Sequence, residues 1–443
     1  MSSGDVPGAT GPAQPGPSEA FQAMRARERG LSRLLLLFIG TGLAFMLLPG
    51  TFLGVWNLIA ISSREAPQSV SPAWLQAHGH AQIFGWIGSF ILGIGFHSIR
   101  RFQRARPPLA AARFSWVCWT SGVCLRWAAG VYAWQWRALL PLSAALELAA
   151  FLVFFRTVAA HERAGADGRK PLDTWVVIVI GATCGFLLAL LVNAGGAAYT
   201  ALAGDLPAFP AALDERFLHL ETWGFLVPFV WGFSARWLPV FLGLRPTSDR
   251  VLVAALALDA AGAVCALAGW TMAAVTLALA ATVLAPLALE LFRGAVAPPK
   301  TRGVHPSFPL FIRVAYAWAI VAAILGVWAE SAASPAGIAG ASRHALTVGF
   351  LAAMVFSVGQ RVLPAFSGGR LLFSARLMLW ALLLLNLGCT VRVGAEILAY
   401  QRYAEWAWRL LPGSAVIELA AVSVFAANLG VTFARKPVSP LYG

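Results

Sequence analysis

The feature that most constrains this chain is a series of long apolar runs, each of roughly 20 residues, between residues 34 and 433. A helix of that length spans the hydrocarbon core of a bilayer, which is about 30 Å thick. The runs lie at 34–58, 79–99, 113–133, 138–160, 174–202, 217–241, 250–269, 271–292, 309–329, 343–364, 374–398 and 411–433. The sequence therefore predicts an all-α integral membrane protein with about twelve transmembrane helices.

Composition supports the lipid bilayer as the main partner. Of the 443 residues, 59% are hydrophobic and 12% are charged, which leaves too few polar side chains to cover a soluble globule of this size. The excess of 33 Lys and Arg over 19 Asp and Glu is spread over alternate short loops. A nucleic-acid-binding face would gather these charges on one surface, so no nucleic-acid partner is predicted.

The positions of the basic loops predict the topology. Arg and Lys are concentrated after every second run: Arg100, Arg101, Arg104, Arg106, Arg163, Arg169, Lys170, Arg245, Arg250, Arg293, Lys300, Arg302, Arg370, Arg376, Arg435 and Lys436. Because basic loops stay in the cytoplasm, both termini are expected there. Residues 1–32, rich in Pro, Gly, Ser and Ala, are predicted to be a disordered cytoplasmic tail, and 436–443 a short C-terminal tail.

The five cysteines all fall inside apolar runs: Cys118, Cys124, Cys184, Cys265 and Cys389. None belongs to a C-x-x-C or C-x-x-C-H motif. The sequence therefore indicates neither a disulfide framework nor covalently attached c-type haem, and the cysteines are interpreted as small hydrophobic side chains.

The second, sixth and tenth runs repeat one pattern, which starts at His80, His219 and His344. Each histidine is followed five residues later by glycine, then by an aromatic residue, and at plus twenty-two by phenylalanine. The starting histidines are 139 and 125 residues apart, which is four helices each time. An internal repeat at this spacing predicts three related four-helix units, at 33–170, 171–300 and 301–435.

The first and third units match at further positions. LPLSAALELAAFLVF aligns with LPGSAVIELAAVSVF, which pairs Glu147 with Glu418, and G-V-C-L-R aligns with G-C-T-V-R, which pairs Arg126 with Arg392. The middle unit has neither charge and offers only Asp259. Its divergence leaves the first and third units as the more similar pair.

Three histidines in one register suggest a metal site. If the units surround a pseudo-threefold axis, His80, His219 and His344 lie at one membrane depth and can converge. Imidazole is a good ligand for haem iron and for copper, and an intramembrane histidine is a functional candidate. The alternative is structural: each histidine caps or hydrogen-bonds a helix start at the interface.

Another histidine, His78, lies two residues before His80, which is about 200° around a helix. The two side chains cannot both point at one centre. Either they serve two centres on opposite sides of the helix, or His78 faces water.

Arg126 and Glu147 are expected at similar depths in adjacent helices, as are Arg392 and Glu418. A buried charge needs a partner, so intramembrane Arg–Glu pairs are the structural interpretation. The functional interpretation, compatible with the first, is that Arg126 and Arg392 clamp haem propionates through charge-assisted hydrogen bonds.

The segments HGHAQIFGW, HLETWGF and RHALTVGF, followed by RVLPAF, resemble the NnrS family of bacterial membrane proteins over nearly the whole chain after the tail. Members are described as haem- and copper-containing and are associated with nitric oxide metabolism and relief of nitrosative stress. The resemblance implies a metal-binding protein of the bacterial inner membrane, with nitric oxide or another small diatomic molecule as its ligand. The implied ligands are His80, His219 and His344, with His78 as a further candidate.

A more distant likeness is to subunit I of the haem–copper oxidases and nitric oxide reductases, which has twelve helices in three arcs. That analogy implies His80 and His344 as the axial pair of one haem, with His219 facing copper. The sequence departs from it: the seventh run has no histidine, the tenth has one rather than two, and H-L-E-T-W lacks the motif's proline and tyrosine. A three-histidine copper site of the oxidase kind cannot be assembled, and an oxygen reductase is not predicted.

Two other functional classes remain open. Twelve helices with internal repeats suit a transporter, although threefold repetition differs from the usual two-half plan. A non-catalytic sensor or metal-handling protein would have the same ligands as a slow enzyme, so the sequence does not decide whether the protein is an enzyme. It identifies no redox partner either.

Overall fold

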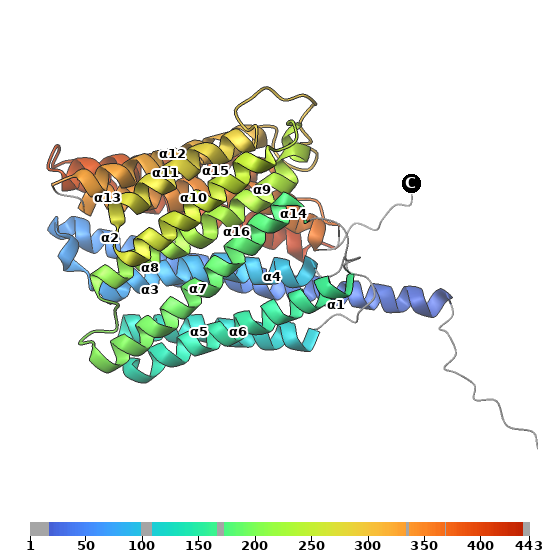
Figure 1. The fold of residues 1–443 in the computed structure, drawn as a ribbon, viewed down its shortest axis with the longest axis horizontal. Helices are drawn as coiled ribbons and strands as arrows, with labels where there is room; N and C mark the ends of the chain where they lie inside the picture. Colours follow the sequence, from blue (N-terminus) through green and yellow to red (C-terminus); the bar gives the residue numbers. More distant parts are fainter. Residues whose placement is uncertain (1–16, 99–108, 166–171, 334–335, 368, 437–443) are drawn as a thin grey trace, which may run out of the picture.

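The computed structural model describes residues 17–98, 109–165, 172–333, 336–367 and 369–436. These residues form a bundle of long helices with no strand among them (Figure 1). Eleven helical stretches of the described chain are long and apolar enough to cross a membrane. Helix α5 (Leu109–Tyr132), which carries Arg113 and Arg126, is a twelfth long stretch, and we call each of these twelve helical stretches a rod. Since lipid offers no hydrogen bonds, each apolar run must satisfy its backbone internally, as a helix does. The predicted all-α membrane architecture is confirmed.

Four of the twelve rods contain a π-helical segment. They are α1 (Pro17–Phe45) with η1 (Met46–Phe52) and α2 (Leu53–Arg64), α3 (Pro72–His80) with η3 (Ala81–Gly88) and α4 (Ser89–Ser98), α8 (Ala211–Glu221) with η5 (Thr222–Leu226) and α9 (Val227–Leu242), and α13 (Ala336–His344) with η6 (Ala345–Ala352) and α14 (Ala353–Phe366). A short 3₁₀ turn, η2 (Pro67–Ser69), precedes α3.

The other rods are continuous. Besides α5 they are α6 (Trp136–Gly165), α7 (Thr174–Ala203), α10 (Asp249–Ala268), α11 (Thr271–Ala288), α12 (Phe308–Ser331), α15 (Ala375–Tyr400) and α16 (Ala407–Ala434). All twelve rods overlap the twelve predicted spans.

The ends of the chain differ from the expectation in one respect. Helix α1 begins at Pro17, inside the segment predicted to be a disordered tail. Residues 1–16 and 437–443 of the predicted tails lie outside the described residues, as do Arg100, Arg101, Arg104, Arg106, Arg169 and Lys170 of the predicted cytoplasmic loops.

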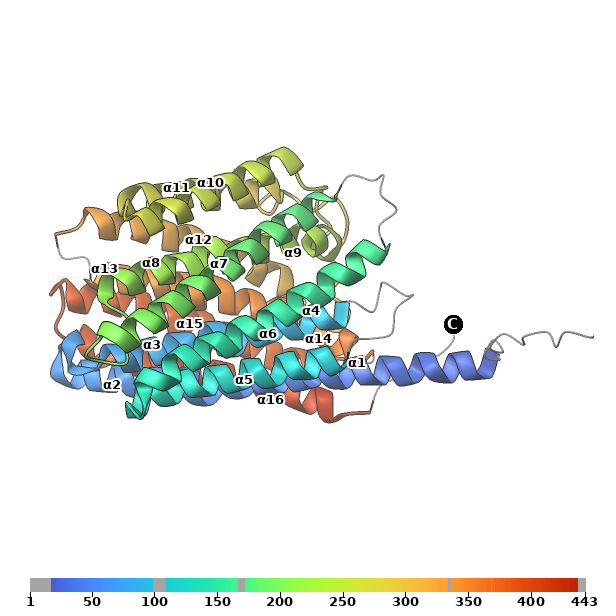
Figure 2. The ribbon, with the colours of Figure 1, turned by 60° about the horizontal axis from the view of Figure 1, so that its bottom comes forward.

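The helices close into a ring. Within the three predicted units, α5 packs on α6, α10 on α11 and α15 on α16. Between units, α6 packs on α7, α11 on α12, and α16 returns to α2 (Figure 2). Three four-helix units arranged around an axis require this cyclic packing, although the repeat itself stays a prediction.

The two ends of the bundle are distinct. Helix α1 begins and α16 ends at one end, whereas α2, α3, α8 and α13 lie at the other (Figures 1 and 2). We refer to the second as the histidine end, because α3, α8 and α13 carry His78, His80, His219 and His344.

Candidate functional site: a histidine-lined cavity

A cavity of about 1040 Å³ lies at the histidine end. Helices from all three predicted units contribute to its wall, and its volume is at the upper end of the range for small-molecule sites. Its ionisable wall residues include His78, His80, His219, His344, Arg126, Arg343, Arg392, Asp214, Glu221, Glu396 and Glu418. All four histidines predicted as metal ligands therefore border one cavity.

A π-helical segment follows each histidine of the sequence repeat. Segment η3 begins one residue after His80, η6 one residue after His344, and η5 three residues after His219. Such segments are rare and concentrate at functional sites. The sequence repeat is thus accompanied by a repeated π-helical segment, which hydrophobic periodicity does not reveal.

The His78 side chain is held by an irregular part of the first rod. Its Nδ1 lies 2.9 Å from the carbonyl oxygen of Gly50, which follows Pro49 in η1. A carbonyl only accepts, so Nδ1 carries the proton and Nε2 keeps its lone pair. The imidazole rests against Gly54, where an added Cβ would lie 2.6 Å from Cε1. Glycine at this position makes room for the ring.

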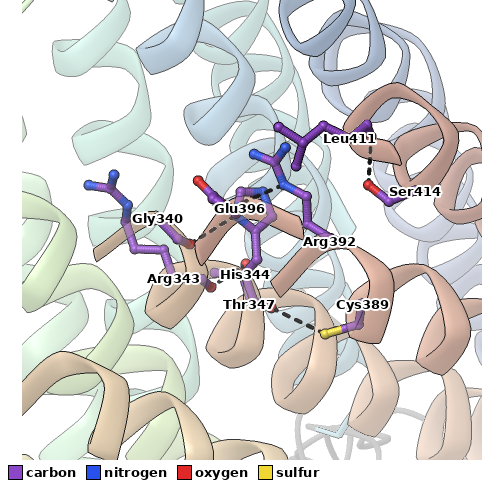
Figure 3. Close-up of polar contacts among 9 residues, drawn as sticks. All are labelled: Gly340, Arg343, His344, Thr347, Cys389, Arg392, Glu396, Leu411 and Ser414. Atoms are coloured by element: carbon purple, nitrogen blue, oxygen red, sulfur yellow. Dashed lines mark hydrogen bonds and ion pairs between the residues drawn. The ribbon is translucent and has the colours of Figure 1, made fainter. Parts of the chain in front are cut away.

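His344 is held in a similar way but with a charged partner. Its Nδ1 lies 3.0 Å from the carbonyl oxygen of Gly340 and 3.3 Å from Oε2 of Glu396 (Figure 3). Both partners are acceptors, so this ring too presents its Nε2 lone pair. The same Glu396 oxygen lies 3.3 Å from Nε of Arg392, and both of these side chains are buried.

These two histidines line the same cavity. Among the described residues, neither Nε2 has a hydrogen-bond partner, and both side chains line the cavity. The structure therefore places His78 and His344 in the wall of one cavity, each with its Nδ1 bonded to a carbonyl.

His80 is turned away from this pair. Its Nε2 lies 2.7 Å from Oε1 of Glu147, whose Oε2 accepts a hydrogen bond of 3.0 Å from Nδ2 of Asn193. The ring stacks on Phe84, with centroids 4.6 Å apart. The buried Nδ1 has no partner among the described residues. His78 and His80 thus point toward different helices, as their 200° separation requires.

His219 stands alone in the middle unit. Its buried Nε2 has no hydrogen-bond partner among the described residues, and the same holds for Oε2 of Glu221 two residues later. Both side chains border the cavity. The described residues contain no group of three or more His, Cys, Asp or Glu side chains arranged to hold one metal ion.

The predicted pairing of Arg126 with Glu147 and of Arg392 with Glu418 is wrong, because the structure gives these side chains other partners. Glu147 binds His80 rather than Arg126, whose guanidinium lies 4.4 Å from the ring centre of Phe209. Arg392 pairs with Glu396, because that side chain is one turn away on the same helix. Glu418 keeps a buried Oε1 without a partner among the described residues.

Several important residues were missed by the sequence reasoning. Glu396 follows Arg392 by four residues, a spacing that favours an ion pair on one helix face. The Pro49–Gly50 pair interrupts the first apolar run, which indicates an irregular turn. Asn193 gave no signal that linked it to Glu147, since its contact depends on how α6 and α7 pack.

The comparison with protein families decides the family. The model of the NnrS family matches residues 36–436, which is most of the chain. The chain belongs to the NnrS family. The predicted resemblance is thus confirmed for this NnrS protein, whereas a comparison with curated proteins gave no match.

Among solved structures, this NnrS protein is similar to one described as a cryo-EM structure of a heme-copper terminal oxidase dimer. The two chains share 12% identity with a TM-score of 0.72, over 92% of this chain and 85% of the other. At that identity the likeness shows the fold alone. It agrees with the distant likeness expected from the twelve-helix pattern.

Proposed function

We propose that this NnrS protein binds haem in the histidine-end cavity, where Nε2 of His78 and Nε2 of His344 would hold the iron, and that it binds nitric oxide or a similar diatomic molecule there. The observation that carries the proposal is the shared arrangement of the two rings. In each, Nδ1 donates to a backbone carbonyl, Nε2 has no hydrogen-bond partner among the described residues, and the side chain lines the cavity. Metal-binding histidines are commonly oriented in this way.

The cavity also suits the rest of a haem group. Arg126 and Arg392 are buried in its wall, and each has an NH1 without a hydrogen-bond partner among the described residues. Such nitrogens can donate charge-assisted hydrogen bonds to propionates. Bound haem supplies an iron that takes small diatomic ligands and changes oxidation state. In this proposal His78, rather than His80, is the partner of His344.

Copper fits less well. His80 offers only Nδ1, because Glu147 occupies its Nε2, and His219 offers its unpartnered Nε2. Without a group of three ligating side chains among the described residues, they do not fit a preformed copper centre. No step of the proposed function depends on copper.

The test is an optical spectrum of detergent-purified protein expressed with adequate haem. His78→Ala and His344→Ala are expected to lose or alter the haem bands, while His80→Ala and His219→Ala keep them. A colourless wild-type protein would overturn haem binding and favour the transporter alternative. Unchanged bands in both His78→Ala and His344→Ala would overturn the ligand assignment.

The biological role we propose is nitric oxide metabolism or resistance to nitrosative stress in the bacterial inner membrane, with both termini cytoplasmic. Steady-state consumption of nitric oxide by haem-loaded protein, compared with a haem-free control, separates an enzyme from a sensor. Reporter fusions at the two termini test the topology, and a periplasmic signal from either would contradict it.

A further inference from the structure

The two proposed haem ligands differ in what supports them. His344 donates its Nδ1 proton to the carbonyl of Gly340, and the carboxylate of Glu396 lies 3.3 Å from the same nitrogen and 3.3 Å from Nε of Arg392. His78 donates to a single neutral carbonyl, that of Gly50. Glu396 and Arg392 are both more than nine-tenths buried, whereas the His344 side chain is 28% exposed.

A carboxylate behind an imidazole changes its strength as a ligand. The negative charge beside Nδ1 raises the basicity of Nε2 more than a neutral carbonyl does. His344 is therefore the stronger electron donor of the two rings. It is also the ring whose orientation is fixed by the larger number of contacts.

The contacts that hold the His78 ring are weaker than those that hold the His344 ring. The carbonyl that holds it belongs to the π-helical segment η1, which contains Pro49. Helix α3, which carries His78, is only nine residues long before η3 begins. Gly79, the next residue, lines the cavity, and an added Cβ there would meet nothing within 4 Å. Space is thus available at Gly79, the residue next to His78 in the chain.

We propose that His344 would hold the haem permanently and His78 exchangeably, so that a diatomic molecule such as nitric oxide binds on the His78 side. This inference rests on the proposed haem site. If haem is held there, Nε2 of His78 would give up its place to the diatomic molecule, a ligand exchange that would need no oxidant or reductant. His78 keeps its proton on Nδ1 throughout.

The first experiment compares reduced His78→Ala and His344→Ala proteins with carbon monoxide as the probe. His78→Ala is expected to keep its haem, to be five-coordinate, and to bind carbon monoxide at least about tenfold faster than wild type, which corresponds to ~1.4 kcal/mol. His344→Ala is expected to retain much less haem. The opposite pattern, or equal behaviour of the two variants, would overturn the inference while leaving haem binding intact.

A second pair of variants tests the same idea without removing a ligand. Gly54→Ala places a methyl group 2.6 Å from Cε1 of His78 and should displace the ring, which raises the carbon monoxide association rate. Gly40→Ala, in the same rod, meets nothing within 4 Å and is the matched control. Equal rates in Gly54→Ala, Gly40→Ala and wild type would contradict an exchangeable His78. Loss of haem bands from the wild type itself would instead contradict the proposed function.

Discussion

The first and third predicted units hold their repeated histidines by different chemistry. In the first unit, Nε2 of His80 forms a hydrogen bond with Oε1 of Glu147 on α6. In the third, His344 uses Nδ1 toward Gly340 and Glu396, and Glu418, the counterpart of Glu147, has an unpartnered oxygen. Equivalent positions in a sequence repeat therefore do not imply equivalent roles, because the partner decides which ring nitrogen faces the cavity.

The surroundings of the two glutamates are nonetheless alike. A Cβ at Gly122 would lie 2.7 Å from Cγ of Glu147, and one at Gly388 would lie 2.6 Å from Cγ of Glu418. In both units a glycine makes room for the stem of a glutamate on the next helix. The difference lies only at the carboxylate, where one unit has a histidine and the other does not.

The largest expected effect is on stability and distinguishes these glutamates. Glu147→Leu leaves His80 and Asn193 buried without their acceptor and should cost ~3–5 kcal/mol of unfolding free energy. Glu418→Leu removes an oxygen that has no partner among the described residues, so its cost should be much smaller. Unfolding in mixed micelles measures both. Equal losses would show that the two glutamates have the same role.

The next prediction concerns the carboxylate behind His344. Glu396→Gln should weaken haem binding by about 10–100-fold, the usual cost of losing the partner that orients a metal-binding histidine. Glu418→Gln is the matched control and should bind haem as the wild type does. Haem titration of the two purified variants provides the measurement, and an unchanged affinity in Glu396→Gln would contradict the support we assign to Glu396.

A smaller effect is expected where helices α15 and α16 approach closely. Gly388→Ala pushes against Cγ of Glu418 and should cost ~1–3 kcal/mol through overpacking. Gly413→Ala, on α16, meets nothing within 4 Å and should be neutral. Thermal unfolding of both variants tests this, and a neutral Gly388→Ala would mean that α15 and α16 separate easily.

The smallest effect concerns the outer partner of the His80 contact. Asn193→Ala removes one hydrogen bond to Glu147 and should cost ~0.5–1.5 kcal/mol, because Glu147 keeps His80. Its haem bands should remain as in the wild type. If Asn193→Ala destabilised the protein as much as Glu147→Leu, the His80 contact would contribute little by itself.

The fold was largely predictable from sequence because its cause is local. Each apolar run is long enough to cross a bilayer, and lipid forces such a run to be helical. The cavity was predictable in outline, since the repeat placed His80, His219 and His344 at one end. The partners were not, because a contact such as Glu147 to His80 depends on how two distant helices rotate against each other. Glu396 was the exception, since its spacing from Arg392 is a local signal.

The π-helical segments have a consequence for how the chain tolerates change. A π turn holds one residue more than the α turn it replaces. It therefore rotates the side chains that precede it around the helix axis relative to those that follow it. Removing one residue from η6 would restore ordinary winding and rotate His344 by about 100° relative to α14. The geometry of the cavity thus depends on residue number as much as on residue identity. Insertions and deletions in η3, η5 and η6, the segments that follow the repeated histidines, are expected to be more damaging than most substitutions there.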